Sequence, residues 1–298
     1  MQTRNAYLLL LLTTLFWGGN AVAGKLAIGH ISPMLLTAAR WAVAFSILLA
    51  IGRGNLVRDW PVMRRHLPLI LVLGAAGFSA FNLALYCALL YTSVINASIE
   101  QAAMPLLIFL ANFMLFGLRV TWAQIAGFVI SIAGVVLTAA HGDPQRLIAL
   151  DVNFGDALML IAVIVYGGYT VALRFKPPIH WHSLMIGLTG AAFVTSVPFA
   201  IAEFWYGSGI APDAGGWAII LYTAIFPSIL GQIFYIRGVE LIGANRAGLF
   251  VNLVPIFGTL LSIVILGEDF RTYHAVALMM VLGGIWLAET GGRHIRKS

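Results

Sequence analysis

The fold of this chain is decided by apolar stretches such as residues 155–173, whose sequence is GDALMLIAVIVYGGYTVAL. Asp156 is the only charged residue in it. A membrane-crossing helix needs about 20 mostly apolar residues, so this stretch is long enough to cross a bilayer. Residues 163–165 (VIV) lack the alternation of apolar and polar residues expected of a membrane-barrel strand. The stretch therefore predicts a transmembrane helix, which satisfies its own backbone polar groups in lipid.

Similar stretches extend along the chain on both sides of this one. They cover residues 6–28, 34–51, 67–91, 95–116, 122–140, 184–204, 217–237, 245–266 and 273–289. The connections between them are short and leave no room for a soluble domain. We therefore expect an all-α membrane protein with ten transmembrane helices.

The composition supports a membrane environment. The chain has 298 residues, of which 61% are hydrophobic and 9% charged, and its mean hydropathy is +0.95. A soluble globular domain is typically about 25% charged, so these residues cannot cover a water-facing surface. The net charge of +6 comes from basic residues in the gaps between apolar stretches, not from a basic stripe with interleaved aromatics. We expect a lipid bilayer and a small-molecule substrate as partners, and no nucleic acid.

The distribution of Lys and Arg predicts the orientation. If the N-terminus is cytoplasmic, 13 of these residues lie inside, and Lys25, Arg146 and Arg271 lie outside. The positive-inside rule then places both termini in the cytoplasm of a bacterial-type inner (plasma) membrane. Arg4, the following apolar residues and Ala21-Val22-Ala23 imitate a cleaved signal peptide. Because the apolar stretch continues through Ile28, we expect it to be retained as the first helix.

The two halves of the chain resemble each other at a shift of about 150 residues. Trp17-Gly18-Gly19-Asn20 aligns with Tyr166-Gly167-Gly168-Tyr169, Pro105 with Pro255, Gly117 with Gly267, and Gly134 with Gly284. The predicted halves are residues 1–150 and 151–298, each with five helices. Because five is odd, the second half enters the membrane from the opposite face, and inverted repeats of this kind place a substrate site at their interface.

Three landmarks make the chain resemble a known family. They are Phe16-Trp17-Gly18-Gly19-Asn20 with Lys25, Ser32-Pro33 and Arg40; the prolines Pro105 and Pro255; and Leu266-Gly267-Glu268 with Gly283-Gly284. Together they resemble EamA-type units of the drug/metabolite transporter superfamily, most like the YddG-type aromatic amino acid exporters. The resemblance implies ten helices around a central cavity lined by the first, third and fourth helices of each half. It also implies export of aromatic and other apolar amino acids, and of flat cationic drugs, by alternating access.

The chain departs from a symmetric pattern at two places. Leu118 stands in the first half where the second has Glu268, and Tyr169 stands in the second half where the first has Asn20. We therefore expect the two sides of the cavity to differ chemically.

Polar and aromatic residues within the spans are the candidates for substrate binding. The amides are Asn20, Asn82, Gln101, Gln232 and Asn252, and the aromatic residues are Trp17, Phe78, Phe81, Tyr86, Tyr166, Tyr169 and Tyr235. Phe78, Asn82 and Tyr86 are spaced by four and share one helix face. Such rings can stack on an aromatic or cationic solute. The alternative is that the amides hold helices together and the rings face lipid.

Arg40 and Glu100 are the two clearest charges within the spans, at similar predicted depth. Because pairing lowers the cost of a charge in the membrane, we expect them to form a charge pair. A proton-coupling role for Glu100 and a carboxylate-anchoring role for Arg40 are the alternatives.

Prolines and glycines at matching positions of the halves are candidate hinges. Pro105 and Pro255 each remove a helical hydrogen bond and favour a kink, which predicts paired gate hinges. Gly18, Gly19, Gly167 and Gly168 allow local opening or close helix approach, and plain packing is the alternative.

Other functional classes find little support. Cys87 is the only cysteine, so an intrachain disulfide is impossible. His180-Trp181-His182 has no accompanying acid or cysteine, and we expect neither a metal nor a cofactor. No nucleophile with a nearby base stands out, so we do not expect an enzyme. The remaining alternatives are a carrier for another metabolite or a drug cation, a channel and an intramembrane enzyme. A phosphorylated substrate would require several basic residues within the spans, where Arg40 is the main one.

Overall fold

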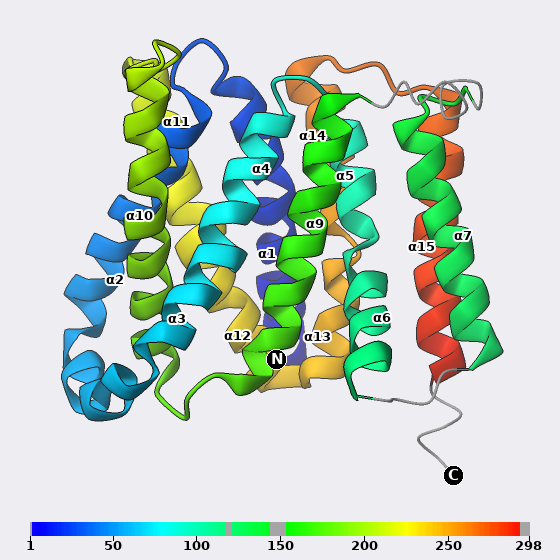
Figure 1. Ribbon diagram of the computed structural model, residues 1–298. Helices are drawn as coiled ribbons and strands as arrows, with labels where there is room; N and C mark the ends of the chain where they lie inside the picture. The colour runs from blue at the N-terminus through cyan, green and yellow to red at the C-terminus, as the bar shows by residue number, and fades with distance from the viewer. Residues whose placement is uncertain (1, 117–120, 144–152, 293–298) are drawn as a thin grey trace.

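The computed structural model describes residues 2–116, 121–143 and 153–292. This part consists of helices joined by short connections and contains no strand (Figure 1). The expected all-helical class is confirmed. Gly117, Leu118 and the predicted boundary between residues 150 and 151 lie outside the described residues.

Each predicted stretch contains a helix. The long helices are α1 (Gln2–Leu26), α2 (Pro33–Met63), α7 (Trp122–Ala139), α9 (Phe154–Ala172), α10 (Trp181–Trp205) and α15 (Thr272–Gly292). The others are interrupted: α3 (Leu67–Gly74), η2 (Ala75–Ala80) and α4 (Phe81–Ala88); α5 (Val94–Ala102) and α6 (Met104–Phe116); α11 (Ala214–Thr223), η4 (Ala224–Leu230) and α12 (Gly231–Ile242); α13 (Ala244–Val251), α14 (Val254–Leu261) and η5 (Ser262–Leu266). Short 3-10 turns, η1 (Arg64–His66) and η3 (Leu173–Phe175), follow α2 and α9.

Eight segments of the described chain are long and apolar enough to cross a membrane, and Thr272–Ala288 is a shorter apolar helix. The longest segment, Pro33–Ala88, has 56 residues. At 1.5 Å per residue it would extend roughly 80 Å if straight, more than twice the thickness of a bilayer core. The chain instead reverses at η1, so that α2 and α3–α4 run in opposite directions (Figure 1). Pro68, in the first turn of α3, has no backbone N–H to continue the hydrogen bonding of α2.

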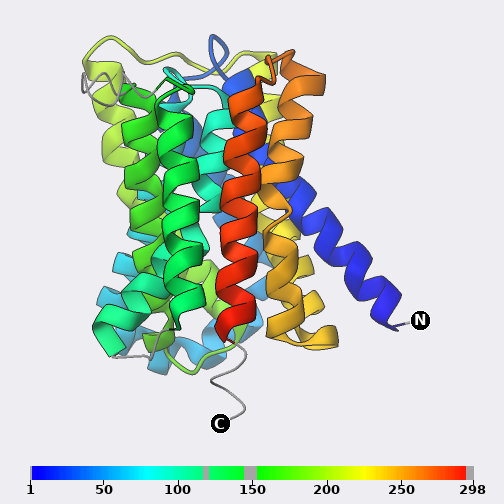
Figure 2. The same cartoon turned by 90° about the vertical axis from the view of Figure 1, so that its right-hand side faces the viewer.

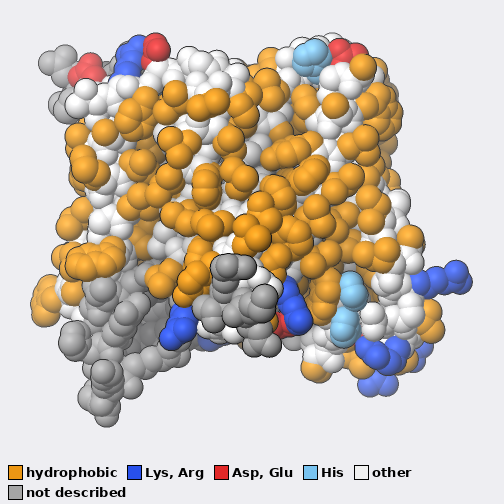
Figure 3. Space-filling model, turned by 180° about the vertical axis from the view of Figure 1, so that it is seen from behind, with side chains coloured by type: hydrophobic (Ala, Val, Ile, Leu, Met, Phe, Trp, Pro, Cys, Tyr) orange, Lys and Arg blue, Asp and Glu red, His pale blue; other side chains and the backbone are white. Residues whose placement is uncertain are grey.

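The outer surface suits a bilayer. Hydrophobic side chains cover the side of the molecule, while charged side chains gather near its two ends (Figure 3). Exposed apolar residues occur along the length of α7, α10 and α15, among them Val129, Val194 and Met279. The start of α1 and the end of α15 lie at the same end of the bundle (Figure 2). The chain is therefore a multi-pass membrane protein.

Helices from the two halves pack closely on one another. α7 lies against α15, α2 against α10, and α1 against α12 and α14, while α9 lies against α4, α5 and α6. Close approach depends on glycine where α1 meets α14: a Cβ on Gly18 would lie 2.7 Å from the backbone nitrogen of Gly258. The packing is thus mostly between halves rather than within each half.

Acidic side chains bind the free N–H groups at three helix starts. Glu203 of α10 accepts hydrogen bonds from Met34 N (3.2 Å) and Leu35 N (3.0 Å) of α2. In return, Asp59 of α2 accepts from His180 N (2.8 Å) and Ser183 Oγ (2.7 Å) at the start of α10. Asp59 lies beyond residue 51, where the sequence analysis placed the end of the second helix. Because α2 continues to Met63, the predicted end was too early.

The third such contact joins the ends of two segments. Glu268, after η5, accepts from Val94 N (2.8 Å) and Ile95 N (3.0 Å) at the start of α5. A carboxylate at a helix start is favourable because the helix dipole and the unpaired N–H groups both attract negative charge.

Candidate functional site

Arg40 is the centre of a buried polar cluster formed by α1, α2, α4 and η4. Its Nη1 donates hydrogen bonds to Asn20 Oδ1 (2.8 Å), Asn82 Oδ1 (2.7 Å) and Tyr86 Oη, and its Nη2 donates to Ser228 Oγ (2.6 Å). Tyr86 Oη in turn donates to Asn20 Oδ1 at 2.8 Å. All five side chains are buried. We call these residues the Arg40 cluster.

The partners of the Arg40 guanidinium are all neutral. It forms no ion pair with an acidic side chain in the described part of the chain, and its Nε has no hydrogen-bond partner there. The guanidinium carbon lies 4.8 Å from the ring centre of Trp41 and 5.7 Å from that of Tyr86. These cation–π contacts and the neutral acceptors lower the cost of the buried charge without cancelling it.

Wider helical turns bring the partners of this cluster into place. η2 and η4 are π-helical turns, in which the regular backbone bonding of the α-helix is interrupted. Within η2, the Phe78 carbonyl accepts from Asn82 Nδ2 (2.7 Å) and from Trp41 Nε1 (3.2 Å). In η4, Ser228 Oγ donates to Thr223 O (2.8 Å), which fixes the hydroxyl that faces Arg40.

A group of aromatic rings adjoins the Arg40 cluster through Trp41 and Phe78. Trp41 stacks on Phe78 (ring centres 4.7 Å apart), and Phe78 contacts Tyr169 (5.8 Å). Tyr166 completes the group by contacting Tyr169 (5.3 Å) and Phe81 (4.9 Å). We call these five residues the aromatic cluster. α2, η2, α4 and α9 therefore bring aromatic residues of both halves together beside the buried arginine.

Trp17 and Tyr235 form a ring contact of their own, and Tyr235 also interacts electrostatically with Tyr166 of the aromatic cluster. Their ring centres lie 5.4 Å apart, and Trp17 Nε1 donates to Pro227 O at 3.1 Å. Since Pro227 precedes Ser228, this pair approaches the Arg40 cluster from the side of η4. The other three predicted amides, Gln101, Gln232 and Asn252, are partly buried and make no side-chain hydrogen bond within the described residues.

The expected pairing of Arg40 with Glu100 is wrong in this structure. Arg40 bonds to the neutral groups named above, whereas both carboxyl oxygens of Glu100 are buried without a hydrogen-bond partner in the described chain. Similar depth along two helices does not bring side chains together unless the helix faces also match. Glu100 interacts electrostatically with Asp156 of α9, a helix that packs against α5.

The predicted hinge prolines both follow a break in a helix. Ala103 separates α5 from α6 just before Pro105, and residues 252–253 separate α13 from α14 just before Pro255. Each proline thus lies in the first turn of the new helix, where its missing N–H is not needed.

The predicted glycines behave differently in the two halves. A Cβ on Gly18 or Gly19 would collide with α14 or with Tyr222. A Cβ on Gly168 would meet nothing within 4 Å, and one on Gly167 would make only ordinary contacts. Close packing therefore explains Gly18 and Gly19 but not their counterparts.

Several residues of these clusters escaped the sequence analysis. Trp41 and Ser228 belong to the Arg40 surroundings, and Asn96, Asp156, His141 and His274 form a separate polar group described below. Trp41 could have been identified from the sequence, because it directly follows Arg40. Ser228 carried no signal, because a serine in an apolar helix usually bonds to its own backbone.

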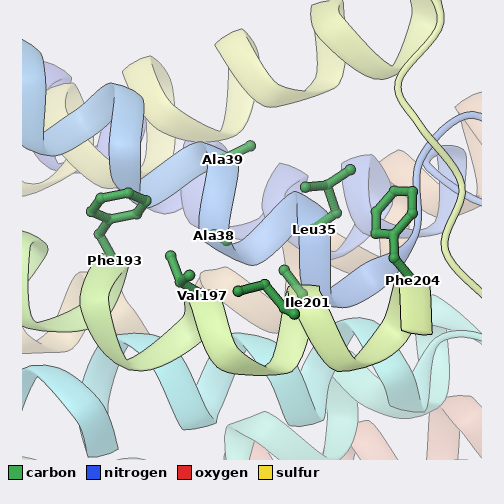
Figure 4. Close-up of a pocket in the computed structure, with 8 residues that line it drawn as sticks. Leu35, Ala38, Ala39, Phe193, Val197, Ile201 and Phe204 are labelled. Atoms are coloured by element: carbon green, nitrogen blue, oxygen red, sulfur yellow. The ribbon is translucent and has the colours of Figure 1, made fainter. Parts of the chain in front are cut away.

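Two grooves on the surface are lined by other residues than those of these clusters. One of about 440 Å³ between α2 and α10 is entirely apolar, with Leu35, Phe193, Ile201 and Phe204 among its walls (Figure 4). Another of about 430 Å³ is lined by residues of α1, α10 and α12, including Arg237 and Glu240. Neither contains a predicted binding residue. The first suits a lipid chain rather than a polar solute, since it offers no group to orient one.

No group of three metal-ligating side chains is gathered within the described residues. His180 and His182 serve the start of α10 instead: His180 Nδ1 accepts from His182 N at 3.2 Å, and His182 Nδ1 lies 3.2 Å from Asn55 Nδ2.

Comparisons with known proteins match the whole length of the chain. The EamA-like transporter family matches residues 4–140 and again residues 153–290, which confirms the resemblance inferred from the sequence. A probable terminal-alkyne amino-acid exporter of Streptantibioticus cattleyicolor is 28% identical, over 90% of this chain and 88% of the relative. A probable amino-acid metabolite efflux pump of Salmonella typhimurium is 24% identical (98% and 97%). The uncharacterized transporter YyaM of Bacillus subtilis is 25% identical (97% and 95%).

One crystal structure has the same fold. It covers 97% of this chain and 98% of its own, with a TM-score of 0.64 and 23% sequence identity.

Proposed function

The chain belongs to the EamA-like transporter family, and from this premise we propose that it exports small amphiphilic solutes, namely aromatic and other apolar amino acids, by alternating access. It is a membrane transporter and not an enzyme. Two of the relatives named above are called amino-acid exporters or efflux pumps, which supports this class of substrate.

The architecture proposed for this function is ten transmembrane helices in two inverted halves, residues 1–150 and 151–298. Eight candidate spans are present, one of them, Pro33–Ala88, folded into two passes, and Thr272–Ala288 adds another, which makes ten. Packing between halves supports the inversion. If each element is exchanged for its counterpart, the contact of α1 with α12 becomes that of α9 with α4. In the same way, the contacts of α1 with α13 and α14 become those of α9 with α5 and α6, and all of these contacts occur.

The observation that carries the substrate proposal is the unused hydrogen-bonding capacity of Arg40. A guanidinium has five N–H donors. Nη1 is committed to the Arg40 cluster and one N–H of Nη2 to Ser228, which leaves Nε and the second N–H of Nη2. Nε and Nη2 form one edge of the guanidinium, and such an edge can bind a carboxylate with two parallel hydrogen bonds. A buried cation without an acidic partner gains most from an anionic ligand.

The aromatic cluster supports the second half of the proposal. An amino acid held by its carboxylate at Arg40 has its side chain near Trp41 and Phe78, which touch both the Arg40 cluster and the other rings. Aromatic walls with a few placed polar groups favour apolar and aromatic side chains. Since the clusters fill the interior in this structure, binding requires the rings to separate, as alternating access would allow.

The alternatives are less well supported. A drug cation would be repelled by the unpaired charge of Arg40 in a medium of low dielectric constant. A channel would require a continuous polar pathway, whereas the aromatic cluster places ring against ring beside Arg40. For orientation, we propose that the end of the bundle holding both termini is cytoplasmic in an inner membrane, as the 13:3 distribution of basic residues predicts.

Flux through purified protein in liposomes tests this function. Phenylalanine and phenethylamine share an aromatic ring, but only phenylalanine has a carboxylate. We expect wild-type protein to transport phenylalanine, and Arg40→Met to lose this flux. Arg237→Met, which changes an exposed arginine, is the matched control and should transport normally.

Arg40→Met must remain folded for this comparison, which its thermal unfolding in detergent checks. A folded Arg40→Met protein that transports phenylalanine at the wild-type rate would show that Arg40 holds helices together and binds no substrate. Preference of the wild type for phenethylamine over phenylalanine would instead favour a cation carrier.

A further inference from the structure

A second buried polar group lies apart from the Arg40 cluster, between α5, α9 and α15. Thr92 Oγ1 donates a hydrogen bond to Asp156 Oδ1, and Asn96 Nδ2 donates to Thr92 Oγ1 at 3.4 Å. His274 Nε2 lies 3.1 Å from Asn96 Oδ1. His274 Nδ1 accepts from Arg271 N at 3.0 Å, so Nε2 carries the proton and donates to the amide oxygen. Thr92, Asn96, Asp156 and His274 are all buried.

Glu100 lies one helical turn beyond Asn96 on the same face of α5. Its exposed fraction is 0%, and neither carboxyl oxygen has a hydrogen-bond partner within the described residues. Asp156 is another buried acid, on the neighbouring helix α9, and it interacts electrostatically with Glu100. This arrangement is costly unless at least one of them is neutral.

The surrounding charges do not neutralise Glu100. Several helices pack against α5. Three of them, α6, α7 and α14, contain no titratable residue. The other helices that pack against α5 are α1, α9 and α15. Their titratable side chains nearest this group are Lys25 of α1, Asp156, Tyr166 and Tyr169 of α9, and Tyr273 and His274 of α15. Two more lie in connections, His141 after α7 and Glu268 before α15.

The cation among these groups is committed elsewhere. Lys25 Nζ donates to Leu89 O (2.7 Å) and Thr92 O (2.8 Å), and it interacts electrostatically with Glu268. His274 donates its Nε2 proton to Asn96. A carboxylate at Glu100 would thus lack both a counter-charge and a hydrogen-bond donor, whereas the carboxylic acid needs neither. Burial without a counter-charge therefore favours the neutral, protonated form of Glu100.

Asp156 connects this position to the surface. Its Oδ2 lies 3.5 Å from His141 Nε2, and the side chain of His141 is 27% exposed. His141 follows the end of α7, opposite the end of the bundle where α1 begins and α15 ends (Figure 1). A proton entering at His141 therefore meets Asp156 before Glu100, and it arrives from the side that the proposed orientation makes external.

We propose that Glu100 is a proton-binding site, loaded from the external side through His141 and Asp156, and that its proton is exchanged for substrate during export. In binding, a proton from water forms an O–H bond with the Glu100 carboxylate and makes it neutral; in release, this bond breaks and the proton returns to water. Coupling rests on the proposed function, because the proton moves inward as the amino acid moves outward. The break after Ala102 and the predicted hinge at Pro105 follow Glu100 directly, so movement there would alter the surroundings of the carboxyl group.

Infrared spectroscopy tests proton binding without reference to any substrate. A carboxylic acid has a C=O stretching band distinct from that of a carboxylate. We expect wild-type protein at neutral pH to show this band and Glu100→Gln to lose it. Gln resembles the neutral acid in shape and charge, so the variant should fold. Glu240→Gln, at an exposed acid paired with Arg237, should retain the band. An unchanged band in Glu100→Gln would overturn the proposal.

Liposome flux tests the coupling. With an acidic interior and phenylalanine outside, one pH unit can support at most about a tenfold accumulation if one proton is exchanged per substrate. We expect wild type and Glu240→Gln to accumulate phenylalanine, and Glu100→Gln to equilibrate it without accumulation. Accumulation by Glu100→Gln equal to that of wild type would overturn the coupling. If wild type transports no amino acid, the proposed function fails, whereas loss of the infrared band in Glu100→Gln would still support the proton site.

Discussion

Ser131 Oγ donates a hydrogen bond to the carbonyl oxygen of Val281 at 3.0 Å, and the two residues are 150 positions apart. This separation equals the shift at which the halves resemble each other, so Ser131 contacts its own counterpart. The contacts around it are reciprocal: Gly134 approaches Ala277 and Val281, and Gly284 approaches Gly127 and Ser131. Such reciprocity is expected where helices related by a two-fold axis cross, and it is the most specific support for two inverted halves.

Alanine substitutions at two adjacent glycines of this interface should change the stability of the protein in opposite directions. A Cβ on Gly284 would collide with Ser131 and Gly127, whereas one on Gly283 meets nothing within 4 Å. We expect Gly284→Ala to destabilise the protein by about 1–3 kcal/mol through overpacking. Gly283→Ala should be neutral or stabilise it by up to about 1 kcal/mol, because alanine favours a helix. Thermal unfolding in detergent measures both, and equal effects would contradict the α7–α15 contact.

The two tyrosines nearest the clusters should affect substrates differently. Tyr169 contacts the rings of Phe78 and Tyr166, so Tyr169→Ala should reduce phenylalanine flux more than alanine flux, by about 2- to 10-fold for a ring contact of about 0.5–1.5 kcal/mol. Tyr86 bonds to Arg40 and Asn20, so Tyr86→Phe should reduce both fluxes by a similar factor. Competition between the two amino acids in liposomes measures the ratio. The assignment fails if Tyr169→Ala leaves the ratio unchanged.

The orientation is open to cysteine labelling in intact cells. In a Cys87→Ala background, Ser208→Cys should react with an impermeant thiol reagent, because Ser208 is exposed between α10 and α11, at the proposed external end. Lys176→Cys, exposed between α9 and α10 at the other end, should react only after the cells are opened. The reverse pattern would contradict the orientation inferred from the basic residues.

The start of α5 depends on Glu268. Glu268→Gln removes charge-assisted bonds to Val94 N and Ile95 N, and should cost roughly 0.5–2 kcal/mol, as loss of a helix cap does. Hydrogen exchange should become faster at these two amides before it changes elsewhere. In Glu240→Gln, where an exposed ion pair is lost, exchange at Val94 and Ile95 should match that of wild type.

The site was only partly predictable. The structure brings Asn20, Asn82 and Tyr86 together around Arg40, and Phe78, Phe81, Tyr166 and Tyr169 together in the aromatic cluster, while their role in substrate binding stays a prediction. The pairing of Arg40 with Glu100 was wrong, because depth in the membrane says nothing about the face of the helix from which a side chain extends. Gln101, Gln232 and Asn252 join neither cluster through a hydrogen bond in the described residues.

The sequence alone determined that the chain is helical and crosses the membrane, because segment length and apolar content suffice when every backbone group must be satisfied within the segment. It also located the breaks at Pro105 and Pro255, since proline acts on its own helix. Only the tertiary structure decided the surroundings of the buried charges: that Arg40 lies among Asn20, Asn82, Tyr86 and Ser228, and that Glu100 has no hydrogen-bond partner in the described chain. Those contacts join residues as many as 188 positions apart. They depend on how each helix is rotated about its axis, a choice set by the packing of all the helices together.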